Sequence, residues 1–496
     1  MTRVLTLLTL LFASPASAAS LDDKINQLAQ PLTDVISAFI FFSVPIAGAD
    51  VPLIVCWLIF AAFFFTFYMG FVNFRGFTHA VSIVRGALKN DKHEGEISHF
   101  QALSTAMSGT IGIGNIAGVA ITVSLGGAGA IFWLILAGFV GMTTKFVECT
   151  LGVKYRVLNP DGTVSGGPMY YLRDGLAQKG FPRLGKYLGN FFAVSIVIGC
   201  LGAGNMFQSN QAYVQLVEVS GGASSPLVGY GWLVGLVLAV MVGLIIVGGI
   251  KSIANVTARL VPFMILIYIV GAVIVLAMNA TAIPAAIGAI FAGAFTMSGV
   301  SGGFIGIMIL GFQRAAFSNE AGLGSAAIAH SAVKTDEPLS EGFVALLEPF
   351  MDTVVICTLT GLVLITTLPQ EVLMGGGLSG IELTSSAFES NISWSPVPLS
   401  FVALMFAFST MLAWAYYGIK GWTFLVGEGK LKERAFGVVF CIFIVIGASI
   451  QLSVILDFAD ALIFVMAIPN IIGLYILAPD VKKDLQVYMA KLKDAQ

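Results

Sequence analysis

Long apolar runs separated by short polar connections make up most of the sequence beyond about residue 50. A membrane-spanning helix needs about 20 mostly apolar residues, which distinguishes it from a strand or a short buried helix. By this rule the sequence predicts eleven spans, near residues 51–72, 101–125, 129–152, 187–217, 231–250, 260–278, 287–312, 343–367, 398–425, 435–455 and 459–478. The pattern therefore predicts an all-α membrane protein that crosses the bilayer many times.

The first apolar run, at residues 4–13, is too short for a span. It follows Arg3 and precedes the small residues Ala16-Ser17-Ala18, an order typical of a cleaved signal peptide. We predict a signal peptide at residues 1–18 and an extracytoplasmic segment at residues 19–50. A short first membrane helix is the alternative, although ten apolar residues would not cross a hydrocarbon core of roughly 30 Å.

The basic residues test this topology, because Lys and Arg collect in cytoplasmic connections. All but three of the 25 Lys and Arg residues lie in the connections that eleven spans and an outside N-terminus place inside, or in the tail at residues 479–496; the exceptions are Arg3, Lys24 and Lys145. We therefore expect a multi-pass protein of a bacterial inner (plasma) membrane, with its N-terminus outside after signal cleavage and its C-terminus in the cytoplasm.

Composition excludes several classes of function. Hydrophobic residues make up 57% of the chain, charged residues 10%, and the mean hydropathy is +0.93. A net charge of about −2 argues against a nucleic-acid partner. The five cysteines are scattered singly, so no zinc or disulfide framework is implied. The four histidines lie in polar connections, where solvated side chains are the simplest expectation.

Two apolar segments carry clusters of glycine and small polar residues. Residues 108–115 read Ser-Gly-Thr-Ile-Gly-Ile-Gly-Asn, and residues 294–304 contain five Gly and Ser residues around Val300. Such runs favour unwinding, and unwound backbone at membrane depth is tolerated where it lines a cavity. Close helix packing through small residues is the alternative.

The positions of the two interruptions suggest an internal repeat. If the span at 51–72 is set aside, five spans at 101–278 and five at 279–478 remain, each set beginning with an interrupted helix. Because five is odd, the two sets would have opposite orientations, as in the inverted repeats of secondary transporters. The expected site then lies where the two broken helices meet.

Polar side chains on two other spans are candidates for the same site. Ser409 and Thr410 place hydroxyl oxygens, which suit a hard cation, and Thr410 shares a helix face with Trp414. Asn205 and Gln208 share a face within an apolar helix and are candidate cavity-lining groups. The alternatives are hydroxyls bonded to their own helix and amides that join helices.

Ionisable residues near the membrane are few. Glu348 and Asp352 could relay protons, or pair with Arg314 or Lys334 at a cytoplasmic gate, and Lys145 and Glu148 could form a local pair. We expect no charge at the centre of the membrane. A zwitterionic substrate accompanied by one cation would suit such a site.

Three motifs resemble the alanine/glycine:cation symporters, a family of the leucine-transporter-fold superfamily. They are the stretches Gly112–Ala120, with the sequence GIGNIAGVA; Gly166–Tyr171, with GGPMYY; and Ser318–Ala326, with SNEAGLGSA. The resemblance covers almost the whole mature chain. It implies a sodium-coupled importer of small neutral amino acids, alanine and glycine first, that works by alternating access without an organic cofactor.

The resemblance also implies site residues. The sodium ligands would be the carbonyls of Ser108, Ile111 and Phe406 and the hydroxyls of Ser409 and Thr410. The substrate would be bound by residues of both broken helices and of the two polar spans: Thr110, Gly112, Gly114, Asn115, Asn205, Phe207, Gln208, Ser298, Gly299, Gly302, Gly303, Thr410 and Trp414. The stretch at 298–301 departs from the Ala/Gln-containing pattern of the family, which bears on the substrate preference. The inner loop at 314–335 is expected to form part of the cytoplasmic gate.

Three other functions compete with this interpretation. A channel would need a continuous polar or charged lining, which the spans lack. An intramembrane enzyme would need a motif such as HExxH or a Ser/His/Asp set, and neither occurs in the spans. A proton-coupled amino-acid carrier of the same fold remains open, and so does the oligomeric state.

Overall fold

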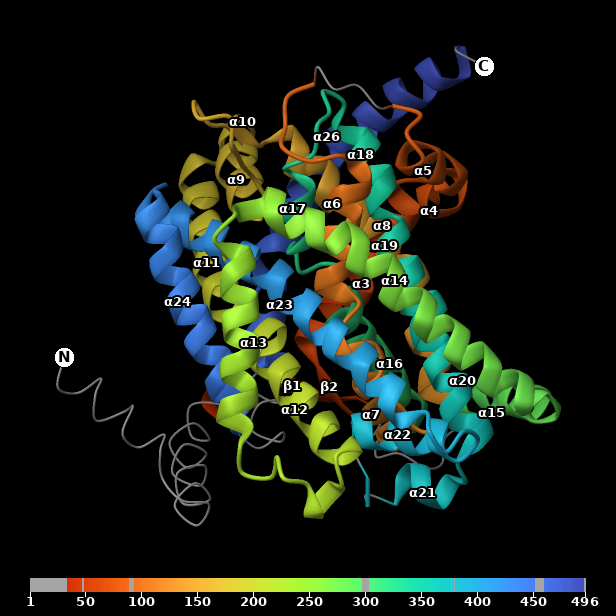
Figure 1. Cartoon of the computed structure of the whole chain (residues 1–496). Helices are drawn as coiled ribbons and strands as arrows, with labels where there is room; N and C mark the ends of the chain where they lie inside the picture. The colour runs from red at the N-terminus through yellow and green to blue at the C-terminus, as the bar shows by residue number, and fades with distance from the viewer. Residues whose placement is uncertain are drawn as a thin grey trace.

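The computed structural model describes residues 34–46, 49–88, 93–296, 303–375, 377–378, 380–450 and 459–494. Helices dominate the described chain and form one elongated bundle (Figure 1). The predicted signal peptide lies outside the described residues, as does the segment 297–302 of the second predicted interruption.

The N-terminal part of the described chain holds a hairpin of β1 (Ser43–Ile46) and β2 (Ala49–Pro52), which pair antiparallel. Helix α3 (Leu53–Tyr68) follows, and then the short α4 (Val72–Arg75) and α5 (Phe77–Val84). A second hairpin pairs two strands of two residues each, β3 (Val157–Leu158) and β4 (Val164–Ser165), which run antiparallel.

The first half of the bundle contains the broken helix. Its elements are α6 (His99–Thr110), the 3₁₀ turn η1 (Ile113–Asn115), α7 (Ala117–Gly126), α8 (Gly129–Lys154), α9 (Pro168–Tyr170), η2 (Tyr171–Gly175), α10 (Leu176–Gln178), α11 (Pro182–Leu201), η3 (Gly202–Met206), α12 (Phe207–Val219), η4 (Gly222–Ser224), α13 (Gly231–Ile246) and α14 (Gly249–Met278).

The second half of the described chain is also mainly helical. Its elements are η5 (Ala280–Ala282), α15 (Ile283–Ala294), α16 (Gly303–Asn319), α17 (Ala326–His330), α18 (Pro338–Ala345), α19 (Leu347–Pro349), η6 (Phe350–Cys357), α20 (Thr358–Thr367), α21 (Gln370–Met374), α22 (Ile381–Glu389), α23 (Pro396–Val426), α24 (Lys430–Gly447) and α26 (Ala467–Asp494).

A described helix lies in each of the eleven apolar ranges. Six helical stretches are long and apolar enough to cross a membrane: Gly129–Lys154, Pro182–Val219, Gly249–Met278, Pro338–Thr367, Pro396–Val426 and Ala459–Asp494. The bent pair α6 and α7 is a seventh candidate, and α3, α13 and α15 lie in shorter apolar helices. The chain is thus a multi-pass helical membrane protein, and the count of eleven remains a prediction.

Local sequence explains where the broken helix begins and where it ends. Ser98 and Gln101 form a capping box, in which Ser98 Oγ accepts the Gln101 N–H and Gln101 Oε1 accepts the Ser98 N–H, so α6 begins at His99. At its other end α7 stops at Gly126, before Gly127 in the left-handed region at φ +64°.

Candidate functional site

The interruption predicted at residues 108–115 is present. The axis bends by 60° between α6 and the helical stretch Ile113–Gly126. Gly112 is extended, with φ −127° and ψ −163°, and its N–H bonds to Asn115 Oδ1 at 2.9 Å instead of returning to α6. The break therefore frees carbonyls at the end of α6 and turns amides at the start of η1 toward side chains.

Two side chains from distant helices meet the break at Gly112. A methyl group added to Gly112 would lie 2.6 Å from Thr410 Oγ1 of α23 and 3.1 Å from Gln208 Oε1 of α12. Gln208 Oε1 accepts the Ile113 N–H at 3.2 Å. Three sequence-predicted site residues are thus brought together around one backbone position.

The two adjacent hydroxyls of α23 differ in their bonding. Ser409 Oγ lies 3.1 Å from Phe406 O, the back-bonding arrangement that was the alternative to a ligand role. Thr410 Oγ1 is buried and has no hydrogen-bond partner among the described residues. Because an unpaired buried hydroxyl is costly, this oxygen suits a ligand.

Trp414 lies one turn beyond Thr410 and also reaches the break. Its indole N–H donates to Gly109 O at 3.2 Å, and a methyl group at Gly204 would meet the ring at 2.0 Å. Gly204 belongs to η3, a π-helical turn between α11 and α12 that interrupts one long helix. Such turns are frequent at functional sites. The indole is therefore held between the two interrupted helices.

Asn205 and Phe207 point to other neighbours. Asn205 Nδ2 donates to Phe440 O of α24 at 2.8 Å, while its Oδ1 has no partner among the described residues. Phe207 contacts Phe317 of α16, with ring centroids 5.9 Å apart. The shared face expected for Asn205 and Gln208 is divided: Gln208 meets the break, whereas the Asn205 amide meets α24.

Asn115 holds the break against the second half of the bundle. Its Nδ2 lies 2.6 Å from Asp352 Oδ1 and 3.2 Å from Ser318 Oγ, and Ser318 Oγ donates to Asp352 Oδ2 at 2.9 Å. This buried carboxylate thus receives neutral donors from both halves. The sequence suggested a pairing of Asp352 with Arg314 or Lys334, but Arg314 pairs with Asp460 at 2.6 Å.

The remaining predicted residues are placed as follows. The Ser108 and Thr110 hydroxyls bond to the carbonyls of Thr105 and Met107, at 2.7 and 3.3 Å. Ile111 and Phe406 are fully buried. Gly114 faces the ring of Phe317, and Gly303 begins α16 with φ +56°. Ser298, Gly299 and Gly302 lie outside the described residues.

A buried network of ionisable side chains is the feature that the sequence did not predict. Lys145 of α8 pairs with Glu348 at 3.3 Å, His330 bonds to both Glu348 and Glu341, and Glu341 also bonds to His99. All five side chains are at most 8% exposed. The expectations of solvated histidines and of a Lys145–Glu148 pair are therefore wrong at these positions; Glu148 bonds to Asn470 at 2.7 Å instead.

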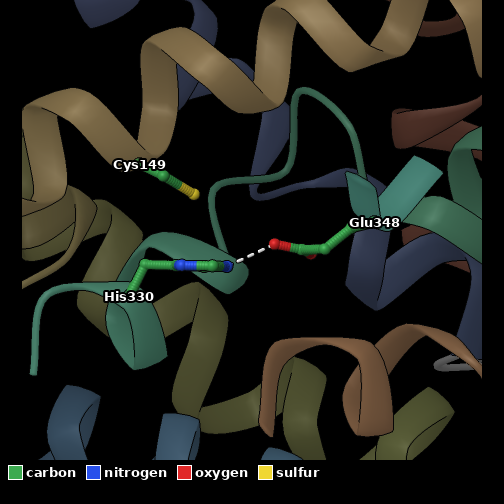
Figure 2. A group of neighbouring side chains, drawn as sticks. All are labelled: Cys149, His330 and Glu348. Carbon is green, nitrogen blue, oxygen red and sulfur yellow. Dashed lines mark hydrogen bonds and ion pairs between the residues drawn. The ribbon is translucent and has the colours of Figure 1, made fainter. Parts of the chain in front are cut away.

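Figure 2 shows the centre of this network, where Cys149, His330 and Glu348 point toward one another. Their three candidate ligand atoms lie within 4.8 Å of one another, an arrangement that could hold a metal ion. However, both ring nitrogens of His330 already face carboxylates, Glu341 at 2.6 Å from Nδ1 and Glu348 at Nε2. The arrangement is therefore that of an ion-pair network. Sequence spacing could not indicate it, because Lys145 and His99 lie far from His330, Glu341 and Glu348 in the chain and meet them only in the folded bundle.

Two groups of the inner loop at 314–335 have shifted pKa values. Burial disfavours the charged form of His330, but the carboxylates of Glu348 and Glu341 outweigh burial and raise its pKa to about 9. Burial raises the pKa of Glu320 to about 7, against the opposing effects of Lys145 and the Ser325 hydroxyl. Ser325 is fully buried, so this part of the loop belongs to the packed interior.

Known proteins resemble this chain in sequence and in fold. A family model described as "Sodium:alanine symporter family" matches residues 37–496. The chain is 40% identical over 439 residues to the sodium/alanine symporter AgcS of Methanococcus maripaludis, covering 88% of this chain and 94% of that protein. It is 33% identical to the amino-acid carrier protein AlsT of Bacillus subtilis, covering 84% of each. The fold matches MhsT, solved in complex with L-phenylalanine, with a TM-score of 0.55, 14% identity and coverage of 79% of this chain and 99% of MhsT.

Proposed function

Because the chain belongs to the sodium:alanine symporter family, we propose that it imports small neutral amino acids, alanine and glycine among them, together with sodium. As a member of a transporter family, it is not an enzyme. We propose eleven spans, ten of which form a 5+5 inverted repeat that changes access from one side of the membrane to the other. The observation that carries the proposal is the break at Gly112, where an unpaired hydroxyl and half-helix amides lie side by side.

The ion site that we propose uses oxygen atoms from the end of α6 and from α23. Its ligands are the carbonyls of Ser108 and Ile111, the carbonyl of Phe406 and the hydroxyls of Ser409 and Thr410. Support comes from Thr410 Oγ1, which is buried, lacks a partner among the described residues and lies against Gly112. Hard oxygen ligands of this kind suit sodium.

The substrate site that we propose lies on the other side of the same break. A substrate carboxylate would accept from the amides at Gly112–Gly114, replacing Asn115 Oδ1 on the Gly112 N–H and Gln208 Oε1 on the Ile113 N–H. The ammonium would meet carbonyls of the second broken helix near Ser298–Gly303. Trp414 would limit the length of the substrate side chain, because its indole is already fixed by Gly109 and Gly204.

Coupling follows if one break serves both ligands. The ion would hold the carbonyl end of α6, and the substrate carboxylate would hold the amide end of η1. When both are bound, Ile111–Gly114 would be fixed in a single conformation, so the two halves of the bundle could move past one another only with both ligands or with neither.

Uptake into proteoliposomes tests the proposal. Purified protein is reconstituted, and radiolabelled alanine is supplied with an inward gradient of sodium, potassium or protons in parallel. Accumulation with sodium alone supports sodium symport. Uptake in sodium-free buffer driven by a pH gradient would instead support the second candidate, a proton-coupled carrier, which the buried carboxylate of Asp352 beside the break favours. If none of the three gradients supports alanine uptake, the assignment of alanine as a substrate is wrong. The substrate is then sought by competition across the twenty amino acids.

A further inference from the structure

A groove at the edge of the bundle lies apart from the break. It occupies about 780 Å³ between α13 and α24 and is closed at one end by the start of α14 and by α23. Helices α13 and α24 run side by side at the left of Figure 1. The groove therefore opens at a surface that would face lipid.

Most of the groove is apolar. Its walls are aliphatic side chains, among them Leu236 and Val240 of α13, Val247 directly after α13, and Val438 and Ile442 of α24. Each of these is between 45% and 63% exposed. In a membrane protein, exposed side chains of this kind contact hydrocarbon, so the walls suit an acyl chain.

One end of the groove is basic. Lys251, Lys420, Lys430 and Arg434 line it, with only Glu96 and Glu433 as acidic partners. Glu96 interacts electrostatically with Lys251 and Lys420 and accepts the Val164 N–H at 2.8 Å. None of the direct ion pairs within the described part of the chain involves the four cations. This end thus has an excess of positive charge that can bind an anionic group.

The sequence places that end on the inner side of the membrane. Lys251 and Lys430 lie in connections that the distribution of basic residues predicts to be cytoplasmic, and Lys420 lies in the last two turns of α23, next to the connection that carries Lys430. A basic pocket between helices at this level matches the phosphate of a lipid in the inner leaflet, while the apolar walls match its tail. Neither a soluble anion nor an uncharged lipid satisfies both ends.

We propose that this groove is a binding site for one anionic phospholipid of the cytoplasmic leaflet. The phosphate lies among Lys251, Lys430 and Arg434, and an acyl chain follows α13 and α24. The inference depends on the chain spanning the membrane and not on which amino acid it carries. The helix along which the acyl chain would lie, α24, is also joined to the predicted site residue Asn205 by the hydrogen bond from Asn205 Nδ2 to Phe440 O.

Native mass spectrometry of the detergent-purified protein, titrated with dioleoylphosphatidylglycerol or dioleoylphosphatidylcholine, tests the site. The variant Lys251→Ala/Lys430→Ala/Arg434→Ala should lose affinity for phosphatidylglycerol by about tenfold or more, with little change for phosphatidylcholine. The control Lys483→Ala/Lys491→Ala/Lys493→Ala removes three exposed charges from α26 and should bind phosphatidylglycerol as the wild type does.

A second variant keeps the test independent of total charge. Gly243 lines the apolar part, and Gly243→Leu should fill it and weaken phosphatidylglycerol binding while leaving every basic residue in place. The proposal is overturned if the groove variant and the α26 control lose affinity equally, if Gly243→Leu binds normally, or if inorganic phosphate competes as well as the lipid does.

Discussion

At the scale of single residues, one unpaired hydroxyl distinguishes a ligand candidate from a neighbour of the same chemistry. Ser409 bonds to its own helix, whereas Thr410 is buried beside Gly112 without a partner among the described residues. The proposed ion site can therefore use Thr410 directly, while Ser409 must give up its bond to Phe406 O. This difference makes the two positions separable by mutation.

Removing either hydroxyl should weaken the response to sodium. Thr410→Ala should raise the sodium concentration for half-maximal alanine uptake by about tenfold, because one oxygen ligand contributes roughly 1 kcal/mol or more. Ser409→Ala should have a smaller effect in the same direction. The control Thr423→Ala removes a buried hydroxyl of α23 one turn after Lys420, away from the break. Sodium dependence that is unchanged in both site variants would remove the ion-site assignment.

Trp414 should determine substrate size. Trp414→Ala removes the indole held between Gly109 and Gly204, so alanine affinity should fall by about tenfold and longer side chains should compete better. Competition of unlabelled amino acids against alanine uptake measures both effects. Trp422→Ala, on the same helix but packed against Phe436, is the matched control. An unaltered substrate profile would assign Trp414 to packing alone.

At the scale of elements, the break between α6 and α7 depends on the close approach of the Thr410 and Gln208 side chains to the backbone of Gly112. Gly112 has a negative φ, so its backbone conformation is open to other residues, and what requires glycine is the space taken by Thr410 and Gln208. Gly118 lies two residues inside α7 with nothing within 4 Å of an added methyl group. The two glycines thus form a natural test pair.

Gly112→Ala should reduce alanine uptake by about tenfold or more, because a methyl group 2.6 Å from Thr410 Oγ1 must displace a proposed ligand. Gly118→Ala should retain uptake and should slightly stabilise the protein, since alanine is the better helix former. Both are measured in proteoliposomes at matched protein content. Equal activity of the two variants would contradict the placement of the site at the break.

At the scale of the whole molecule, the buried ion-pair network joins helices that are far apart in the sequence. It connects α6, α8, α17, α18 and α19 through His99, Lys145, His330, Glu341 and Glu348. Breaking a buried pair on one side leaves an uncompensated charge, which is strongly destabilising. The packing of these five elements therefore depends on the protonation state of His330.

Stability should accordingly fall at high pH. The pKa of His330 is raised from 6.5 to about 9 in the folded protein, so its contribution is complete below pH 6.5 and is lost as the pH rises through about 9. That shift corresponds to about 3 kcal/mol. Thermal unfolding of the detergent-purified protein between pH 6 and pH 10 should show a decrease that His330→Gln lacks and His79→Gln retains. A decrease that persists in His330→Gln would place the titrating group elsewhere.

Much of the architecture could be predicted from the sequence because each segment that crosses a bilayer must itself be apolar. Each apolar run of about 20 residues is detectable without its neighbours, and the Gly-rich run at 108–115 weakens its own helix whatever lies beside it. The helices at the predicted ranges and the bend before Ile113 follow from these local properties. The three family motifs, at residues 112–120, 166–171 and 318–326, indicated the class of transporter.

Tertiary structure alone decided which polar groups meet. The sequence showed Asn205 and Gln208 on one helix face, but the neighbours of that helix direct one amide to α24 and the other to the break. It showed His330 in a polar connection, but the fold buries that side chain between two carboxylates. Hydrophobicity is a property of each segment, whereas a hydrogen bond or an ion pair requires a partner whose position depends on the packing of the whole bundle.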